Sequence, residues 1–359
     1  GMADAVIVVV RCLRVGKVGG VAHRAASLAA PRHQLATGTV QRSMTCYHIT
    51  LLRFEEFPML LRLLSALAAG LLLSCSAFAD SRVLTTIKPV QLISAALLNG
   101  IDEPAVLLPP GASPHSFALR PSDRRALADA ERIYWVGPNL ERFLEDVLHD
   151  AANARELMDV PGLTLREYAE EHAEHGHDHH DHHHDEGSLD PHIWLSLDNA
   201  LVLARWMKQD LAPLYPEQQA QLDANLAHFE QQVGELEQAL QARFLPLKDK
   251  PYFVFHDGYG CLEEYLGIEH RGVFSLAHEI QPGARHVNTL RDQLRSAGRA
   301  CVFSEPQFTP RLVNSLTDGL PVETAQLDPL GANIEVGADG YIELLNSLTS
   351  SWAGCLEAL

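Results

Sequence analysis

The sequence predicts an α/β protein of two lobes, each with a mostly parallel sheet flanked by helices, joined by one long rigid connecting helix. Short apolar, strand-like segments alternate with helical segments, which is typical of parallel sheets covered on both faces. The alternation occurs in two sets, separated by one long stretch whose apolar residues keep helical spacing. At 359 residues the chain also exceeds the usual size of one hydrophobic core, so two lobes are expected.

The first 79 residues are set apart from these lobes. Residues 59–79, MLLRLLSALAAGLLLSCSAFA, have a basic start, an apolar run and a small-x-small end, the pattern of a secretory signal peptide cleaved after Ala79. In the alternative, LLSC is a lipobox and Cys75 carries a lipid on a very short tether. Because a signal peptide acts from the start of a chain, we interpret residues 1–58 as a non-native upstream extension and Met59 as the initiator. The protein is therefore expected to be exported from the cytoplasm; the family resemblance described below implies the periplasm as its location.

The N-terminal lobe is expected at residues 80–215. Its predicted strands are VLTTIKP, PAVLLPP, RIYWVG and ARELMD, separated by helical segments such as VQLISAALLNG and PSDRRALADA. Each strand is apolar enough to be buried, which favours a parallel sheet.

The connecting helix is expected at residues 216–246, between Pro216 and Pro246. Its apolar positions keep helical spacing: Leu222, Leu226, Phe229, Val233, Leu236 and Leu240. A helical connector is stiffer than a Gly/Ser hinge and would permit only modest lobe movement. Residues 247–359 are then the C-terminal lobe, with predicted strands YFVFHDG, HRGVFSL, ACVFSEP and VETAQLDP.

The charge of the mature chain is strongly acidic. Residues 80–359 hold 20 Lys or Arg against 43 Asp or Glu. This balance disfavours nucleic-acid binding and favours attraction of cations, although solubility alone explains it equally well. The hydrophobic content of 47% is that of a soluble globular protein, which we expect to be a monomer.

One tract, residues 171–187 (EHAEHGHDHHDHHHDEG), packs eight histidines and six carboxylates into 17 positions. Its histidines are His172, His175, His177, His179, His180, His182, His183 and His184. A purification tag is disfavoured because the tract is internal and interrupted by acids, whereas His-rich composition is typical of metal binding. So few apolar residues cannot offset the ordering entropy, so we expect a mobile loop that binds metal weakly. The principal site is therefore expected elsewhere.

Three further histidines occupy the turns where ligands gather in α/β proteins. His115 lies in LPPGASPHSFALRPSD after a predicted strand, His192 lies in LDPHIWLSLDNA, and His256 ends the first predicted strand of the second lobe. Ligands collect at the carboxyl ends of parallel strands and between domains, so these side chains could converge in an interlobe cleft. For any one of them alone, a structural hydrogen-bonded histidine is the better explanation.

Three cysteines lie in the mature chain, which predicts one disulfide and one spare thiol in an oxidising compartment. Cys301 heads an apolar strand and Cys355 lies near the C-terminus, so joining them would tie down the final helix. Closing a loop of roughly fifty residues contributes about 4 kcal/mol on the chain-entropy model. Cys261 is expected to be a buried thiol, with a metal ligand as the alternative.

An ordered series of motifs carries a resemblance to a known family. PGASPHSFALRPSD, DPHIWLSLDNA, FHDGYGCLEEYLG, EIQPGAR, FSEPQF and LDPLG resemble the motifs of periplasmic metal-binding proteins that serve ABC importers, specifically the high-affinity zinc-uptake group. The resemblance covers residues 82–359. It implies two metal-binding α/β lobes on a connecting helix, Zn²⁺ as the transported ligand, an inner-membrane ABC zinc permease as partner, and the His-rich tract as an accessory zinc loop.

The resemblance also implies a ligand set. His115, His192 and His256 match the three imidazole ligands, and Asp328 matches a carboxylate that completes the site in some relatives. Some zinc members have Glu before the first histidine, where this chain has Pro114, which leaves Asp328 or water as the fourth ligand. Manganese relatives resemble the same scaffold but have Glu at the third position; three imidazoles suit zinc better.

Other functions remain as alternatives. A manganese- or iron-binding relative or a metal-dependent adhesin shares the scaffold. A zinc hydrolase or lyase would need a general base, for which Glu305 or Glu279 is a candidate, but the sequence has neither an HExxH helix nor a P-loop. We therefore expect a binding protein rather than an enzyme.

Overall fold

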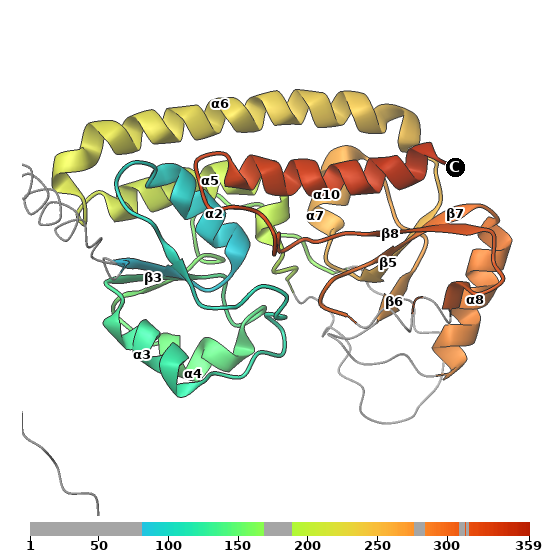
Figure 1. Cartoon of the computed structure of the whole chain (residues 1–359), viewed down its shortest axis with the longest axis horizontal. Coiled ribbons are helices and arrows are strands. Elements are labelled where there is room, and N and C mark those ends of the chain that lie inside the picture. Colours follow the sequence, from blue (N-terminus) through green and yellow to red (C-terminus); the bar gives the residue numbers. More distant parts are fainter. Residues whose placement is uncertain (1–80, 169–188, 276–283, 309–312, 314–315) are drawn as a thin grey trace, which may run out of the picture. The chain divides into compact units, whose positions relative to one another are not determined.

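Two four-stranded parallel sheets organise the chain (Figure 1). The structure, a computed structural model, describes residues 81–168, 189–275, 284–308, 313 and 316–359. The first sheet has the order β2-β1-β3-β4 and consists of β1 (Val83–Thr85), β2 (Ala105–Val106), β3 (Arg132–Trp135) and β4 (Ala154–Glu156). The second has the order β6-β5-β7-β8 and consists of β5 (Tyr252–His256), β6 (Val273–Ser275), β7 (Ala300–Ser304) and β8 (Val322–Gln326). Each neighbouring pair is parallel.

The strands are shorter than the apolar segments predicted from the sequence. Helix α2 (Lys88–Leu97) begins within VLTTIKP because Pro89 suits the first turn of a helix. Strand β2 ends at Val106, before Pro109 and Pro110. Strands β2 and β4 are half-buried rather than buried, since both lie at the edges of their sheet.

Helices of the first lobe begin at caps that the sequence supplies. Helix α3 (Pro121–Asp129) starts with Pro121, and the Arg120 N–H donates to the Asp123 carboxylate at 2.8 Å. Helix α5 (Leu197–Leu211) starts at Ser196, whose hydroxyl oxygen accepts the Asn199 N–H at 3.2 Å. The short helices η2 (Arg142–Leu144), α4 (Glu145–Leu148) and η3 (Ile193–Leu195) complete this part.

The long helix α6 (Gln219–Phe244) follows η4 (Pro216–Gln218) and leads into η5 (Leu245–Leu247), so the predicted connecting helix is helical throughout. Its buried side chains repeat every three or four residues: Leu222, Asn225, Phe229, Val233, Leu236, Leu240 and Phe244. Asn225 replaces the predicted Leu226 on the buried stripe, and its amide donates to the carbonyls of Leu97 and Asn99. Leu226 is partly buried beside it.

The second lobe adds α7 (Gly260–Leu266), α8 (Ala284–Ala297) and the C-terminal α10 (Gly340–Glu357). Helix α7 ends at Gly267, whose φ of 65° is left-handed and favours glycine. Helix α10 packs on α2 and α6 and also on β7 and β8 (Figure 1). It therefore holds elements of both lobes together.

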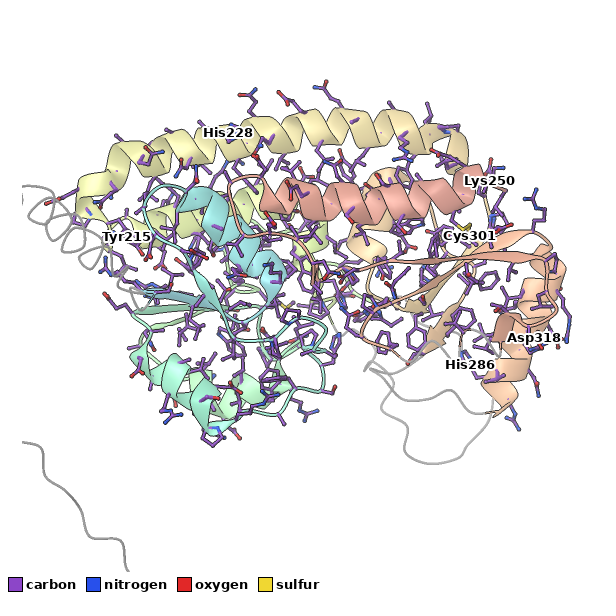
Figure 2. The ribbon with its side chains drawn as sticks, viewed as in Figure 1. Tyr215, His228, Lys250, His286, Cys301 and Asp318 are labelled. Carbon is purple, nitrogen blue, oxygen red and sulfur yellow. A yellow bond between two sulfur atoms is a disulfide. The ribbon has the colours of Figure 1, made fainter. Side chains whose placement is uncertain are left out.

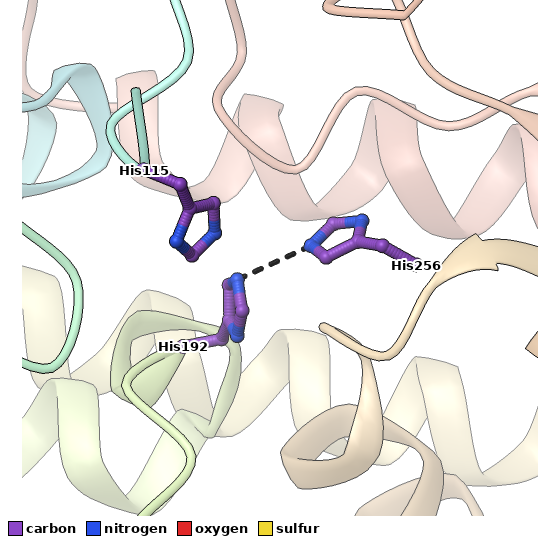
Figure 3. Close-up of side chains that lie close together, drawn as sticks. All are labelled: His115, His192 and His256. Carbon is purple, nitrogen blue, oxygen red and sulfur yellow. Dashed lines mark hydrogen bonds between the residues drawn. The ribbon is translucent and has the colours of Figure 1, made fainter. Parts of the chain in front are cut away.

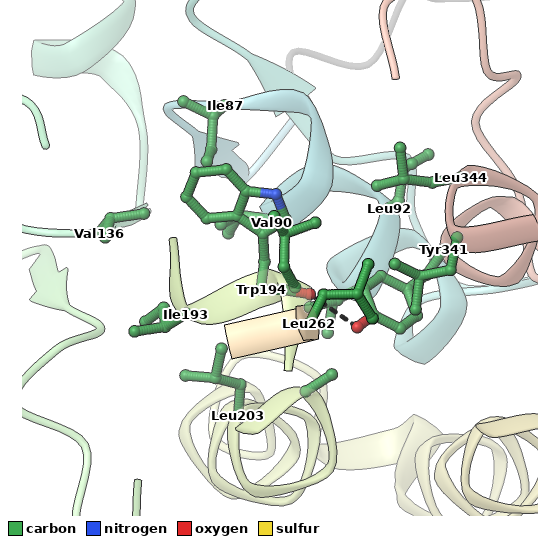
Figure 4. Close-up of a cluster of buried hydrophobic side chains, with 14 of the residues drawn as sticks. Ile87, Val90, Leu92, Val136, Ile193, Trp194, Leu203, Leu262, Tyr341 and Leu344 are labelled. Atoms are coloured by element: carbon green, nitrogen blue, oxygen red, sulfur yellow. Dashed lines mark hydrogen bonds between the residues drawn. The ribbon is translucent and has the colours of Figure 1, made fainter. Parts of the chain in front are cut away.

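Buried hydrophobic side chains, with Trp194 and Tyr341 among them, pack where the two lobes meet (Figure 4). Trp194 is 1% exposed, and its indole N–H donates to the Pro329 carbonyl at 2.9 Å. The Tyr341 hydroxyl, on α10, donates to the Trp194 carbonyl at 2.7 Å. These hydrogen bonds fix the segment next to His192 against the second lobe.

A disulfide joins Cys301 to Cys355, as the sequence predicts (Figure 2). It links strand β7 to helix α10 and closes a loop with a sequence separation of 54. Cys261 is a buried free thiol, and burial raises its pKa well above the ordinary value. The expected spare thiol is therefore inert as a nucleophile near neutral pH.

The predicted fold class is confirmed: two parallel sheets flanked by helices and one long helix between them in sequence. Residues 1–58 and the predicted signal peptide at 59–79, with Cys75, lie outside the described residues, as does the His-rich tract at 171–187. Of the helices that the structure describes, none has the length and hydropathy required to cross a bilayer.

Candidate metal centre

His256 is the last residue of β5, the strand that lies inside the second sheet. All five residues of this strand are buried, and the apolar ones anchor it in the core. The imidazole therefore projects from the carboxyl end of a parallel sheet, where ligands of α/β proteins gather. Gly258 follows closely: a Cβ there would lie 2.3 Å from His256 Nε2 and 3.0 Å from His192 Nε2. Only glycine leaves room for both rings.

His192 lies immediately before the short helix η3. The His192 backbone N–H donates to the Asp190 carboxylate at 3.0 Å, which holds the turn, and the His192 ring contacts the Trp194 ring. The side chain is buried, with 2% exposure of the residue.

His115 lies in the loop between β2 and α3, after the proline and glycine residues that end the strand segment. The His115 backbone N–H donates to the Ser113 hydroxyl at 3.2 Å. The residue is half-buried, so it is the most accessible of the three predicted imidazoles.

The three histidines converge (Figure 3). Their ring centroids lie 5.5 Å (His115 to His192), 6.0 Å (His115 to His256) and 5.1 Å (His192 to His256) apart. The Nε2 atoms of His192 and His256 are 3.3 Å apart, and one nitrogen from each ring lies within 4.8 Å of the others. In the part of the chain that the structure describes, these residues form the one group of three or more potential metal-binding side chains. The arrangement can hold a single cation among three nitrogen donors.

Two buried carboxylates accompany two of these rings. Asp190 accepts from His192 Nδ1 at 2.8 Å, and Glu305 accepts from His256 Nδ1 at 2.5 Å. Burial opposes ionisation of Asp190, but the hydrogen bond and charge of His192 hold its pKa below the ordinary value. Burial likewise opposes protonation of His256, but the Glu305 carboxylate raises the pKa of that imidazole.

The three rings line a small cavity of about 20 Å³, enough for one water-sized species. Its other lining residues are mostly apolar: Ser113, Pro114, Trp194, Glu305, Gln307, Phe308, Pro329 and Leu330. Such walls lower the local dielectric and strengthen the attraction between the donors and a cation.

Asp328, the fourth ligand implied by the resemblance, lies outside the group of three histidines. Its carboxylate accepts the backbone N–H groups of Leu330, Gly331 and Ala332 at 3.2, 3.0 and 2.8 Å. The Gln307 amide also donates to it, at 3.3 Å. Its role as a ligand stays a prediction.

Sequence reasoning missed the role of Asp190 and gave Glu305 a different one. Asp190 stands two residues before His192, a spacing that suits a turn and gives a local signal. Glu305 was a candidate general base, but it accepts the His256 ring hydrogen bond. Glu279, the other candidate base, and the tract histidines lie outside the described residues. Cys261 lies 3.8 Å from Asp190 Oδ2 and is not part of the three-histidine group.

Comparisons with known proteins identify the family of the chain. Residues 83–355 match the family model described as "Zinc-uptake complex component A periplasmic". The high-affinity zinc uptake system protein ZnuA of Yersinia pestis is 39% identical over 308 residues, covering 81% of this chain and 97% of the relative. That of Brucella suis is 35% identical over 325 residues, covering 82% and 97%.

Solved structures share the fold. A crystal structure of ZnuA has a TM-score of 0.64 at 23% identity, covering 76% of this chain and 98% of that one. A laminin-binding protein of Streptococcus agalactiae, described as having adhesin and metal-transporting activity, has a TM-score of 0.63 at 20% identity, covering 76% and 98%. The family model and the identities together establish that the chain belongs to the family of periplasmic components of zinc-uptake complexes.

Proposed function

We propose that this chain is a periplasmic zinc-binding protein that captures Zn²⁺ between His115, His192 and His256 and delivers it to an ABC permease for import. The observation that carries the proposal is the convergence of the three imidazoles, with one nitrogen of each within 4.8 Å of the others. Family membership supports zinc uptake as the process. The same membership supports a binding role rather than catalysis.

The donor set suits zinc. Neutral imidazole is a preferred zinc ligand, and three protein ligands leave one tetrahedral position open, whereas manganese favours oxygen donors. Water is the better candidate than Asp328 for that position, because the Asp328 carboxylate already accepts three backbone N–H groups.

Delivery requires that the ion leave the cleft. His256 belongs to the second lobe, while His115 and His192 belong to the first. A small separation of the lobes would remove one of three ligands and weaken binding. The Trp194 hydrogen bond to the Pro329 carbonyl crosses this junction, so it would resist that separation until the permease engages the protein.

Export and capture complete the proposal. Residues 59–79 would act as the signal peptide, and the Cys301–Cys355 disulfide supports an oxidising compartment such as the periplasm. The histidines of the tract at 171–187 would collect zinc in loose sites and raise its local concentration near the cleft.

Growth under zinc limitation tests this function. Deletion of the gene from its source bacterium should stop growth in chelator-treated medium, and added zinc should restore it. Re-expression of the wild-type protein should restore growth without added zinc, whereas the His256→Ala protein, exported to the same level, should not. Normal growth of the deletion strain at the lowest zinc concentrations, with no second importer active, would contradict the proposal.

A further inference from the structure

Two of the three imidazoles are hydrogen-bonded through Nδ1 to carboxylates that are almost completely buried. Asp190 and Glu305 are 0% and 2% exposed, and their oxygens lie 2.8 and 2.5 Å from the Nδ1 atoms of His192 and His256. In each of these two rings the carboxylate binds Nδ1, whereas Nε2 lies 3.3 Å from the Nε2 atom of the other ring.

The register between strands β5 and β7 determines the position of Glu305. Strands β5 and β7 are parallel, with Tyr252 opposite Cys301 and Phe253 opposite Val302. The same offset continued to the strand ends sets His256 beside Glu305. The pair therefore follows from the pairing of two interior strands: His256 is the last residue of β5, and Glu305 is the first residue after β7.

Backbone and side-chain contacts place Asp190. The Asp190 N–H donates to the Arg166 carbonyl at 2.7 Å, and the Arg166 guanidinium lies 3.7 Å from the carboxylate. The His192 backbone N–H donates to the same oxygen that accepts from the His192 ring. Asp190 is thus fixed at both its main chain and its side chain.

The protonation of the rings follows from this arrangement. An ionised carboxylate only accepts hydrogen bonds, so the proton of each neutral ring must be on Nδ1, and each Nε2 then presents a lone pair. Two lone pairs at 3.3 Å repel, and only a cation or a proton between them turns the contact into an attraction.

We propose that Asp190 and Glu305 are positioning residues that hold His192 and His256 as Nδ1–H tautomers and aim both Nε2 lone pairs at one zinc ion. This inference rests on the proposed function. It assigns the carboxylates no contact with the metal; they act by orienting the rings, fixing the tautomer and making the nitrogens more basic, as outer partners of metal-bound histidines do.

The second lobe contains a matched control. Glu263 is 4% exposed and accepts from His270 Nδ1 at 2.9 Å, but His270 is not part of the three-histidine group. Glu263→Gln therefore removes a buried carboxylate from a histidine in the same lobe without touching the proposed site.

Zinc affinity and ring tautomers test the proposal together. Zinc dissociation constants would be measured by chelator competition for the wild type and for Glu305→Gln, Glu305→Ala, Asp190→Asn and Glu263→Gln. We expect a 10- to 100-fold loss for Glu305→Gln and Asp190→Asn, a larger loss for Glu305→Ala, and a change below about twofold for Glu263→Gln. Long-range ¹H–¹⁵N spectra of the zinc-free wild-type protein should show His192 and His256 protonated at Nδ1, and the alanine variant should lose that preference at His256.

The contradictory results are distinct. Wild-type zinc affinity in Glu305→Gln and Asp190→Asn, or Nε2–H tautomers in the wild-type protein, would overturn the inference. A loss of affinity as large in Glu263→Gln would show a general effect of buried carboxylates and would also overturn it. If the wild-type protein binds no zinc tightly, the proposed function fails instead, and the tautomer spectra, which need neither zinc nor a variant, still decide the positioning role.

Discussion

The two sheets share one topology but carry their histidines in different ways. In both, the order places the first strand of the lobe between the second and third, and the pairing is parallel throughout. In the second lobe the donor ends the interior strand β5, and its carboxylate partner follows the neighbouring strand β7. In the first lobe the interior strand β1 ends at Thr85, and the donors come from a loop and from the segment before η3. Topology thus selects the edge of the sheet where the site forms, while local sequence selects the residues that reach it.

The lobes also differ in how they are stabilised. The second lobe has a covalent link between β7 and α10 through Cys301 and Cys355. In the first lobe, Glu141 is buried and its carboxyl group accepts the N–H groups of Val136 and Gly137 at 2.7 and 3.3 Å. The stability of the first lobe should therefore depend on the ionisation of Glu141, and that of the second lobe on the disulfide.

Loss of the second lobe's histidine should have the largest effect. Nanomolar binding corresponds to about 12 kcal/mol, so one of three ligands accounts for about 4 kcal/mol, or a thousandfold in affinity. His256→Ala should weaken zinc binding at least that much by chelator competition, and His115→Ala, on a half-buried loop, should weaken it less. His270→Ala, a histidine of the same lobe outside the group, is the control. Equal affinities for the wild type and His256→Ala would remove the second lobe from the site.

Removal of the disulfide should have the second-largest effect, on the stability of the protein. The double variant Cys301→Ser, Cys355→Ser should lose up to about 4 kcal/mol of unfolding free energy, because its unfolded chain is no longer closed into a loop. Denaturant titration measures this loss, and Cys261→Ser is the control for replacing a buried sulfur. Hydrogen exchange should show lost protection in β7 and α10 while β1 and β3 stay protected. Equal loss in both sheets would contradict the separate stabilisation of the lobes.

A smaller effect is expected at Glu141. Burial raises the pKa of Glu141 to about 7, whereas the unfolded chain titrates near 4.3. The folded state therefore holds the proton to higher pH, and its stabilising contribution, complete below about pH 4.5, is lost as the pH rises to 7. The loss is about 3 kcal/mol. The Glu141→Gln side chain stays neutral, so the free energy of unfolding of this variant should rise by that amount relative to the wild type between pH 4.5 and 7.5. Urea titration at each pH measures the difference. If the free energies of unfolding of the two proteins change with pH in parallel, burial does not control the ionisation of Glu141.

Deletion of the His-rich tract should change the tight site least. Residues 171–187 belong to the first lobe in sequence, and the bridge between Glu167 and Leu189 closes the chain on either side of them. Replacing the tract by a short Gly/Ser linker should lower the number of zinc ions bound while leaving the tight dissociation constant within about twofold. Isothermal titration with a chelator separates the two quantities. If the variant without the tract no longer binds one zinc ion tightly, the principal site lies in the tract rather than in the cleft.

Much of the fold, and the proximity of three candidate ligands, could be predicted from sequence because they depend on local patterns. The alternation of apolar and helical segments indicates parallel sheets, and parallel sheets place His256 at the edge where ligands gather. The Cys301–Cys355 pair was predictable because its partners belong to a strand and a terminal helix.

Other features depend on distances that a sequence does not contain. Glu305 meets His256 because β5 and β7 pair with a particular register, and nothing local to either residue specifies that offset. The need for glycine at 258 arises from two rings that approach from different lobes. Asp328 was assigned from family resemblance, and its three backbone hydrogen bonds arise from a turn that only the folded chain forms.

Anomalous diffraction at the zinc edge from crystals of the zinc-loaded protein would locate the bound metal directly. We expect one dominant peak within about 2.0–2.1 Å of a ring nitrogen of each of His115, His192 and His256. A dominant peak held by histidines of residues 171–187, with none among those three rings, would contradict it.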